Sequence, residues 1–155
     1  MAIREDRKGK TAGGPRLQYA ALPFRRESGL EVMLVSSRET RRWVIPKGWP
    51  MKGLKPHAAA AREALEEAGL EGKVGKQAIG SYTYGKRMPD GSVVSCRVEV
   101  YPLEVAKQRK AWPEKGERTT RWFSAEEAAG AVEESELGEL IRDFVTERAA
   151  VGEKA

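Results

Sequence analysis

Three glutamates, Glu63, Glu66 and Glu67, stand at the spacing i, i+3 and i+4 within one short segment. On an α-helix these positions are neighbours, and each pair of like charges costs roughly 0.2 to 0.5 kcal/mol. A divalent cation would turn this repulsion into attraction. Carboxylate oxygens suit Mg²⁺ or Mn²⁺, which usually keep several waters and bind substrate phosphate oxygens as well. On spacing alone the segment fits either an ordinary solvated acidic helix face, as is common on surface helices, or a metal site for a phosphorylated substrate.

The residues around these glutamates predict a helix over 56–68. Pro56 is tolerated in a first turn, and Gly69 suits a left-handed position at a helix end. His57, at the helix start, has no histidine or cysteine partner and is expected to be exposed. At about 100° per residue the glutamates face outward, and the side expected to be buried consists of Ala58, Ala61, Leu65 and Ala68.

The stretch from Gly48 to Leu70 resembles the signature of the Nudix hydrolase family. That signature reads Gly, five residues, Glu, seven residues, Arg-Glu, an aliphatic residue, any residue, Glu-Glu, any residue, Gly and an aliphatic residue. Its fixed positions are met here by Gly48, Arg62, Glu63, Glu66, Glu67, Gly69 and Leu70. Leu54 stands where the family has its first Glu, and Ala64 where it has a larger aliphatic residue.

The resemblance implies metal-assisted attack of water on the phosphorus of a diphosphate, with Mg²⁺ or Mn²⁺ as cofactor. It implies that Glu63 and Glu67 hold the metal, that Glu66 assists as a ligand or in catalysis, and that Arg62 orients a glutamate or a phosphate. A further carboxylate outside the signature often serves such enzymes, and the candidates are Glu117 and Glu114. Leu54 is expected to alter the site geometry without removing the main ligands.

A narrower resemblance over residues 17–80 is to the diphosphoinositol polyphosphate phosphohydrolase branch, whose members also tend to cleave diadenosine polyphosphates. It is carried by Ala-Ala-Leu-Pro-Phe-Arg, Glu-Val-Met-Leu-Val-Ser-Ser-Arg and Arg-Trp-Val-Ile-Pro. The substrate-binding candidates are Arg25, Ser37, Arg38, Arg42, Lys47 and Gly48. The alternatives are a hydrolase of another diphosphate (ADP-ribose, a nucleotide sugar or an RNA 5′-triphosphate) and a catalytically silent module that binds a nucleotide.

Short apolar runs bounded by turn residues predict strands at residues 19–24, 32–35, 43–45, 78–84, 93–101 and 121–123. Pro23 suggests an edge or an irregularity in the first strand. Cys96 and Trp43 are expected in the core, and residues 107–120 are expected to form a mobile loop. Ser124 with Glu127 fits a capping box, and a final helix is expected from residue 135 to about 149. The predicted fold class is α+β, a mixed sheet with packed helices, compatible with the α/β/α sandwich of the Nudix fold.

The composition fits one domain, expected over residues 16–149, with a disordered tail at 1–15 and a short tail at 150–155. No apolar run approaches the ~20 residues that span a bilayer, and the single cysteine requires no oxidising compartment. A cytoplasmic location is expected. The net charge of +5 and the pI near 9.4 suit a polyanionic substrate such as a small polyphosphate or nucleotide, and equally suit weak nucleic-acid association, although general solubility explains them as well. Neither a membrane segment nor a dedicated nucleic-acid module is expected, and the oligomeric state stays open.

Overall fold

The computed structural model describes residues 14–154, with side chains for 14–148. Most of the tail expected at residues 1–15 therefore lies outside the described part. The elements in chain order are β1 (Arg16–Glu27), β2 (Gly29–Ser36), β3 (Trp43–Val44), β4 (Lys47–Gly48), α1 (Pro56–Ala68), β5 (Leu70–Val74), β6 (Gly80–Arg87), β7 (Val93–Gln108), β8 (Thr120–Ser124), α2 (Ala125–Ala131) and α3 (Ser135–Lys154).

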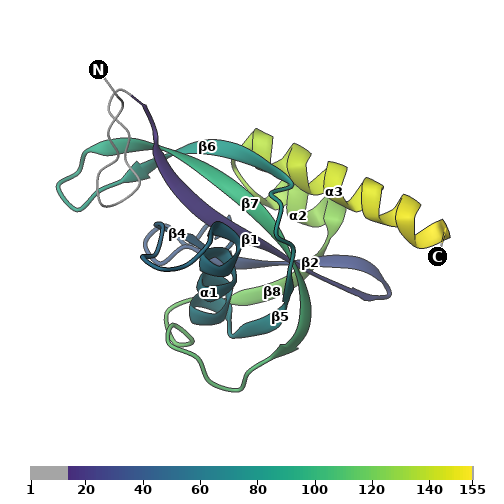
Figure 1. The fold of residues 1–155 in the computed structure, drawn as a ribbon. Helices are drawn as coiled ribbons and strands as arrows, with labels where there is room; N and C mark the ends of the chain where they lie inside the picture. Colours follow the sequence, from purple (N-terminus) through teal and green to yellow (C-terminus); the bar gives the residue numbers. More distant parts are fainter. Residues whose placement is uncertain (1–13, 155) are drawn as a thin grey trace.

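The strands of the described chain form one mixed sheet between two helical layers (Figure 1). Its main path runs β3-β2-β1-β7-β5, while β4 pairs with β1, β6 with β7 and β8 with β2. The β1–β7 pair is parallel and the other pairs are antiparallel. One buried cluster joins the sheet to α1, and the other joins it to α2 and α3. The predicted α+β class with a mixed sheet, in the α/β/α order, is confirmed.

On one side, β1 pairs with different strands along its length, because β1 and β2 separate from each other toward the start of β1. It pairs with β2 from Phe24 to the turn at Gly29, and with β4 at Tyr19 and Ala20. On its other side β7 pairs with it from Arg16 to Phe24. The edge position suggested by Pro23 is therefore wrong, because β1 is internal; the irregularity is the exchange of β2 for β4 near this proline. Lys47 and Gly48, which lie outside the predicted strands, form the short strand β4 beside Tyr19 and Ala20, where β1 and β2 diverge.

α1 has the predicted bounds, and Gly69 follows it in the left-handed region with φ 70°. The predicted buried side was wrong, because the helix is rotated toward its glutamates. The fully buried positions are Ala59, Ala60, Ala64, Glu67 and Ala68, whereas Ala58, Ala61, Leu65 and His57 are only half-buried. The sheet covers one side of α1, and the chain between β7 and β8 covers the side that bears Glu67.

Of the remaining elements, β5 is not among the predicted strands, and β7 extends beyond the predicted residue 101 to Gln108; the others follow the sequence pattern. Cys96, Val98 and Val100 of β7 are buried on one face, and Trp43 packs edge-on against Phe123 with ring centres 5.0 Å apart. The capping box of Ser124 and Glu127 is present at the start of α2. α3 buries four of its expected apolar residues, Leu137, Leu140, Ile141 and Phe144, while Val145 is half-buried.

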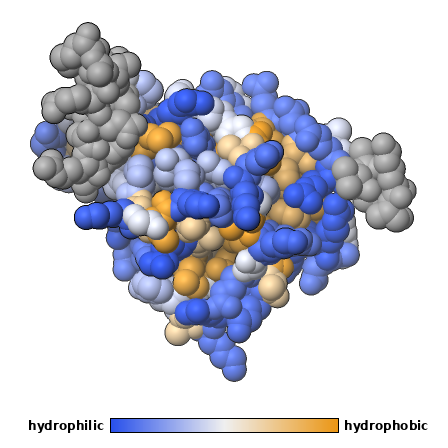
Figure 2. Space-filling model, viewed as in Figure 1, coloured by the Kyte–Doolittle hydropathy of each residue, from blue (hydrophilic) through white to orange (hydrophobic). Residues whose placement is uncertain are grey.

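The face of the molecule seen in Figure 2 is mostly hydrophilic, with smaller apolar areas between charged side chains. This matches a chain in which 33% of residues are charged. Across the described residues, no helix combines the length and apolar character needed to cross a membrane.

Candidate active site

The centre of the candidate site is the contact of Glu63 with Gly48 and Glu67. Gly48 of β4 lies directly against Glu63, so that a Cβ atom at position 48 would overlap the Glu63 carboxylate. The carboxylates of Glu63 and Glu67 are within hydrogen-bonding reach of each other. Burial and the neighbouring carboxylate raise the pKa of Glu63 to about 9. Burial also raises the pKa of Glu67, although the charges of Arg118 and Lys47 oppose that shift.

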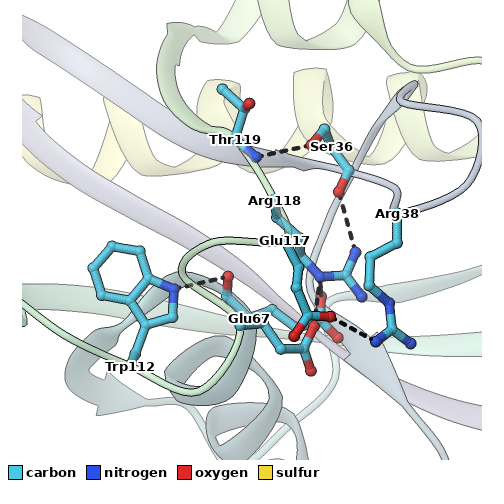
Figure 3. A network of polar contacts seen from close by, with 8 residues as sticks. Ser36, Arg38, Glu67, Trp112, Glu117, Arg118 and Thr119 are labelled. Atoms are coloured by element: carbon cyan, nitrogen blue, oxygen red, sulfur yellow. Dashed lines mark hydrogen bonds and ion pairs between the residues drawn. The ribbon is translucent and has the colours of Figure 1, made fainter.

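Glu67 is only 4% exposed and is held by residues from the chain between β7 and β8 (Figure 3). Arg118 Nε lies 3.9 Å from Glu67 Oε1 and 2.7 Å from Glu114 Oε1. The same guanidinium donates to the Ser36 carbonyl at 3.1 Å. Trp112 Nε1 donates to the carbonyl of Glu67 at 3.2 Å. Arg118 thus places a positive charge beside the Glu67 carboxylate and links it to Glu114 and to β2.

Arg118 is a site residue that sequence reasoning missed. It stands in the polar run that supplied Glu114 and Glu117 as candidates, beside other charged residues of the same type. The one available signal was its position four residues after Glu114. That spacing alone did not distinguish it from a surface arginine.

The donor set of Glu63 and Glu67 fits a hard divalent cation. Two juxtaposed carboxylates that share a mostly buried place repel each other when both are ionised, and a cation removes that cost. Mg²⁺ commonly takes one or two carboxylates and completes its shell with water and phosphate oxygens. Among residues 14–148 no group of three or more acidic, histidine or cysteine side chains is arranged to hold a metal alone. Glu66 is half-buried, and its role as a third ligand or catalytic group stays a prediction.

A cavity of about 360 Å³ lies beside Glu67, where β1 and β2 diverge. Four predicted substrate-binding residues line it together with Glu67: Ser37, Arg38, Arg42 and Lys47. Gln18 and Arg118 contribute to the same surface, and β6 adds Tyr84, Gly85, Lys86 and Arg87. The cavity therefore has an acidic position on α1 and walls rich in arginine and lysine.

Two of the predicted phosphate-binding arginines are already paired with carboxylates. Arg38 Nη1 donates to Glu117 Oε1 at 2.9 Å, and both side chains are about half exposed. Arg42 Nη1 lies 2.8 Å from Glu134 Oε2, and Arg42 Nε lies 3.8 Å from Glu133 Oε1. The predicted catalytic role of Glu117 stays a prediction, and its structural partner is Arg38.

Lys47 differs from these arginines because it forms no ion pair within the described chain. It is half-buried, and its Nζ lies 4.8 Å from the centre of the Tyr84 ring. Burial lowers the pKa of Lys47 to about 8, against the opposing charge of Glu67. An anion in the cavity would restore the lost solvation of this ammonium group.

Three residues singled out by the sequence lie away from the cavity surface. Arg25 donates to Glu31 at 2.8 Å, and its guanidinium lies over the Trp122 ring at 4.1 Å. Arg62 is exposed and forms no ion pair with any carboxylate in the part of the chain described. Leu54, at the position of the missing signature Glu, is half-buried in the loop before α1.

Comparison with known proteins places this geometry in a family. The NUDIX domain model matches residues 15–144. The chain is 33% identical over 132 residues to Nudix hydrolase 16, mitochondrial, of Arabidopsis thaliana. The aligned region covers 74% of this chain and 71% of that protein. It is 35% identical over 118 residues to diphosphoinositol polyphosphate phosphohydrolase 3-beta of Bos taurus. This aligned region covers 74% of this chain and 68% of the relative. Across its first curated relatives the chain spans from 50% to 71% of their length.

A solved structure agrees at the level of the fold. The binary complex of an Ap4A hydrolase from C. elegans superposes with a TM-score of 0.65 at 22% identity, covering 86% of this chain and 98% of that one. Because the family model spans most of the chain and Glu63, Glu66, Glu67 and Arg62 occupy its signature helix, this protein belongs to the Nudix family of hydrolases.

Proposed function

We propose that this protein is a Mg²⁺-dependent pyrophosphohydrolase acting on diphosphoinositol polyphosphates or dinucleoside polyphosphates. The observation that carries the proposal is the cavity in which Glu67 of the carboxylate pair meets Arg38, Arg42 and Lys47. A polyphosphate chain requires both parts, a metal-binding carboxylate at the scissile bond and cations along its length. The names of the relatives, a diphosphoinositol polyphosphate phosphohydrolase and an Ap4A hydrolase, support this substrate class.

The roles of individual residues follow from their positions. Nudix hydrolases generally use divalent metal ions; bound between Glu63 and Glu67, Mg²⁺ would neutralise phosphate oxygens and lower the pKa of a coordinated water. Arg118 keeps Glu67 in place through its ion pairs with Glu67 and Glu114. Glu66 is the proposed base that accepts the proton of the attacking water.

The surrounding cations orient the phosphates of the substrate. Lys47 and Arg42 lie on the cavity wall beside Glu67, and Ser37 offers a hydroxyl on the same wall. Arg38 is proposed to exchange its contact with Glu117 for a phosphate. Glu117 is then free for its alternative role as the catalytic carboxylate.

A hydrolase of ADP-ribose, a nucleotide sugar or an RNA 5′-triphosphate is the second candidate function, since it needs the same carboxylate pair. A silent nucleotide-binding module is disfavoured because Arg62, Glu63, Glu66 and Glu67 are all retained. The cytoplasmic location stays a prediction, and the Arabidopsis thaliana relative is named as a mitochondrial protein.

The test is a hydrolysis panel with diadenosine tetraphosphate, a diphosphoinositol polyphosphate, ADP-ribose and 5′-triphosphorylated RNA, each with Mg²⁺ and with EDTA. We expect Mg²⁺-dependent turnover that is fastest on one of the first two substrates. Fastest turnover on ADP-ribose or RNA would establish the second candidate. Binding of a nucleotide without turnover under any metal would establish the silent module.

A further inference from the structure

The cations on the cavity wall fall into two groups that differ in whether they are paired. Arg38, Arg42 and Arg118 each have a carboxylate within 4.0 Å. Three others on the same wall, Lys47, Lys86 and Arg87, form no ion pair with a carboxylate of the described chain. An incoming anion can bind the second group without first displacing a carboxylate.

The unpaired cations follow one direction away from α1. Lys47 Nζ lies against the Tyr84 ring, and Lys86 stands two residues further along β6, on the same side of the strand as Tyr84. A step of two residues in a strand spans about 6.6 Å. Lys47 and Lys86 therefore mark successive positions on one cavity wall, the first near Glu67 and the second farther away.

The strand that carries Lys86 is firmly fixed. β6 pairs with β7 over its whole length, with Lys86 opposite Val94. The Tyr84 hydroxyl donates to Gln18 at 2.7 Å, and Gln18 is buried in β1. Lys86 itself is half-buried, with its Nζ 6.0 Å from the centre of the Trp49 ring. A cation–π contact at this distance is weak, so a phosphate group can draw the ammonium group away from the ring.

We propose that Lys86 forms a second phosphate subsite that binds the phosphates distant from the cleaved bond and selects substrates with long phosphate chains. Arg87 leaves the opposite side of β6 but also lines the cavity, and it adds positive charge at the edge of this subsite. This inference rests on the proposed function, because it assigns the far part of the same substrate. A substrate with several phosphates reaches from Glu67 past Lys47 to Lys86, whereas a simple diphosphate occupies only the near part.

The test uses Lys86→Met, the double variant Lys86→Met with Arg87→Met, and the control Lys73→Met. Lys73 is an exposed lysine on β5 outside the cavity, so its loss removes the same charge from another surface. Circular dichroism and Tm verify the fold of each variant. Binding of inorganic tripolyphosphate and of inorganic pyrophosphate is measured by calorimetry, and steady-state kinetics are measured with diadenosine tetraphosphate and ADP-ribose.

We expect Lys86→Met to weaken tripolyphosphate binding about tenfold, equivalent to about 1.4 kcal/mol, and to leave pyrophosphate binding within about twofold. KM for diadenosine tetraphosphate should rise about tenfold at nearly constant kcat, while ADP-ribose kinetics stay unchanged. Lys86→Arg should restore most of the lost affinity, since it returns the charge. The double variant should lose more than the single one.

Equal losses on long and short ligands, or unchanged tripolyphosphate binding in the double variant, would overturn the subsite. The absence of tripolyphosphate binding by the wild-type protein would do the same. Failure of the proposed function looks different: the wild-type protein would hydrolyse none of the polyphosphates, yet its tripolyphosphate affinity would still depend on Lys86.

Discussion

For the Glu67 carboxylate, burial and the charges of the neighbouring cations act in opposite directions. It is 4% exposed, next to Glu63 on its own helix and 3.9 Å from Arg118. Burial disfavours the ionised form, and the two nearby cations favour it. Because burial disfavours its charge, this carboxylate adds little to the stability of the fold, and under the proposed function it would hold a cation. Its removal should therefore affect activity more than folding.

Glu67→Gln should lower kcat by at least about tenfold, a barrier increase of ~1.4 kcal/mol, because a neutral amide is a poor ligand for Mg²⁺. The measurements are Mg²⁺-dependent turnover and Mg²⁺ binding by calorimetry. Glu71→Gln, which removes an exposed carboxylate paired with Arg109, is the control and should keep wild-type kinetics. Wild-type turnover in folded Glu67→Gln would remove Glu67 from the metal site.

Gly48→Ala tests the contact between β4 and α1. A Cβ atom would overlap the Glu63 carboxylate, so Glu63 must move away from Glu67. We expect at least a tenfold loss of kcat/KM, about 1.4 kcal/mol, with a Tm near that of the wild type. Gly116→Ala is the matched control, since a Cβ there meets open space. If both variants show the same activity, Gly48 has no role in placing Glu63.

Leu54→Glu restores the acidic residue of the family signature. Arg62 forms no ion pair with the described carboxylates, and a new negative charge in this region should strengthen cation binding. We expect the Mg²⁺ concentration for half-maximal turnover to fall about fivefold, roughly 1 kcal/mol of added attraction. Leu54→Gln keeps the size without the charge and serves as control. Identical Mg²⁺ and Mn²⁺ titrations for both variants and the wild type would contradict this account of Leu54.

At the scale of elements, the segment between β7 and β8 acts as a cover for the end of α1. The Trp112 ring lies against Gly69, and its Nε1 donates to the Glu67 carbonyl. The Glu114 amide donates to the Glu66 carbonyl at 3.0 Å. The segment predicted as a mobile loop is thus hydrogen-bonded to the carbonyls at the end of α1. These contacts also bring Arg118 to Glu67.

Trp112→Ala should destabilise the fold by about 2 kcal/mol, less than the 3 to 5 typical of a fully buried tryptophan, because this ring is half-buried. Urea unfolding measures the change. Trp112→Phe keeps an aromatic ring and loses the hydrogen bond, so it should cost about 1 kcal/mol. Turnover of Trp112→Ala should fall as well, since Arg118 loses its anchored segment. Full stability and activity in Trp112→Ala would show that the segment does not support α1.

At the scale of the whole molecule, the net charge of +5 is unevenly placed. The cavity wall carries Arg38, Arg42, Lys47, Lys86, Arg87 and Arg118 around the buried Glu67. Such a wall attracts polyanions over a distance, and the attraction falls with ionic strength. Part of the basic charge of the described chain thus lies on the cavity wall near α1, where Glu39 and Glu133 also contribute to the lining.

The preference for long phosphate chains should depend on salt. We expect kcat/KM for diadenosine tetraphosphate to exceed that for ADP-ribose by at least about tenfold, equivalent to about 1.4 kcal/mol. This ratio of the two kcat/KM values should fall above about 0.15 M salt, because exposed charges are then screened within about 8 Å. Arg38→Ala should lower this ratio by roughly threefold to tenfold, because a charge-assisted contact is lost.

Arg97→Ala, which removes an exposed arginine of β7 outside the cavity, is the control for Arg38→Ala and should leave the ratio unchanged. Kinetics at 0.05 and 0.5 M salt provide the measurement, with salt levels chosen to bracket the Debye range. Equal losses on both substrates in Arg38→Ala, or a wild-type preference for ADP-ribose, would disprove this substrate preference.

The sequence by itself determined the bounds of α1, the positions of most strands and the alternation in β7. It did so because proline at a first turn, glycine in the left-handed region and apolar periodicity act locally. The signature residues, read with the family resemblance, also identified the carboxylate pair. What the sequence left open were the consequences of contacts between distant segments.

Only the tertiary structure decided which side of α1 is buried, because Trp112 and Arg118 arrive there from the far end of β7. It also decided which cations are free, since the carboxylates that neutralise Arg38 and Arg42 lie far along the chain. Helical spacing places Glu67 on a face but cannot say what covers that face. Pairing between residues remote in sequence depends on how the sheet is ordered, and local patterns carry no record of that order.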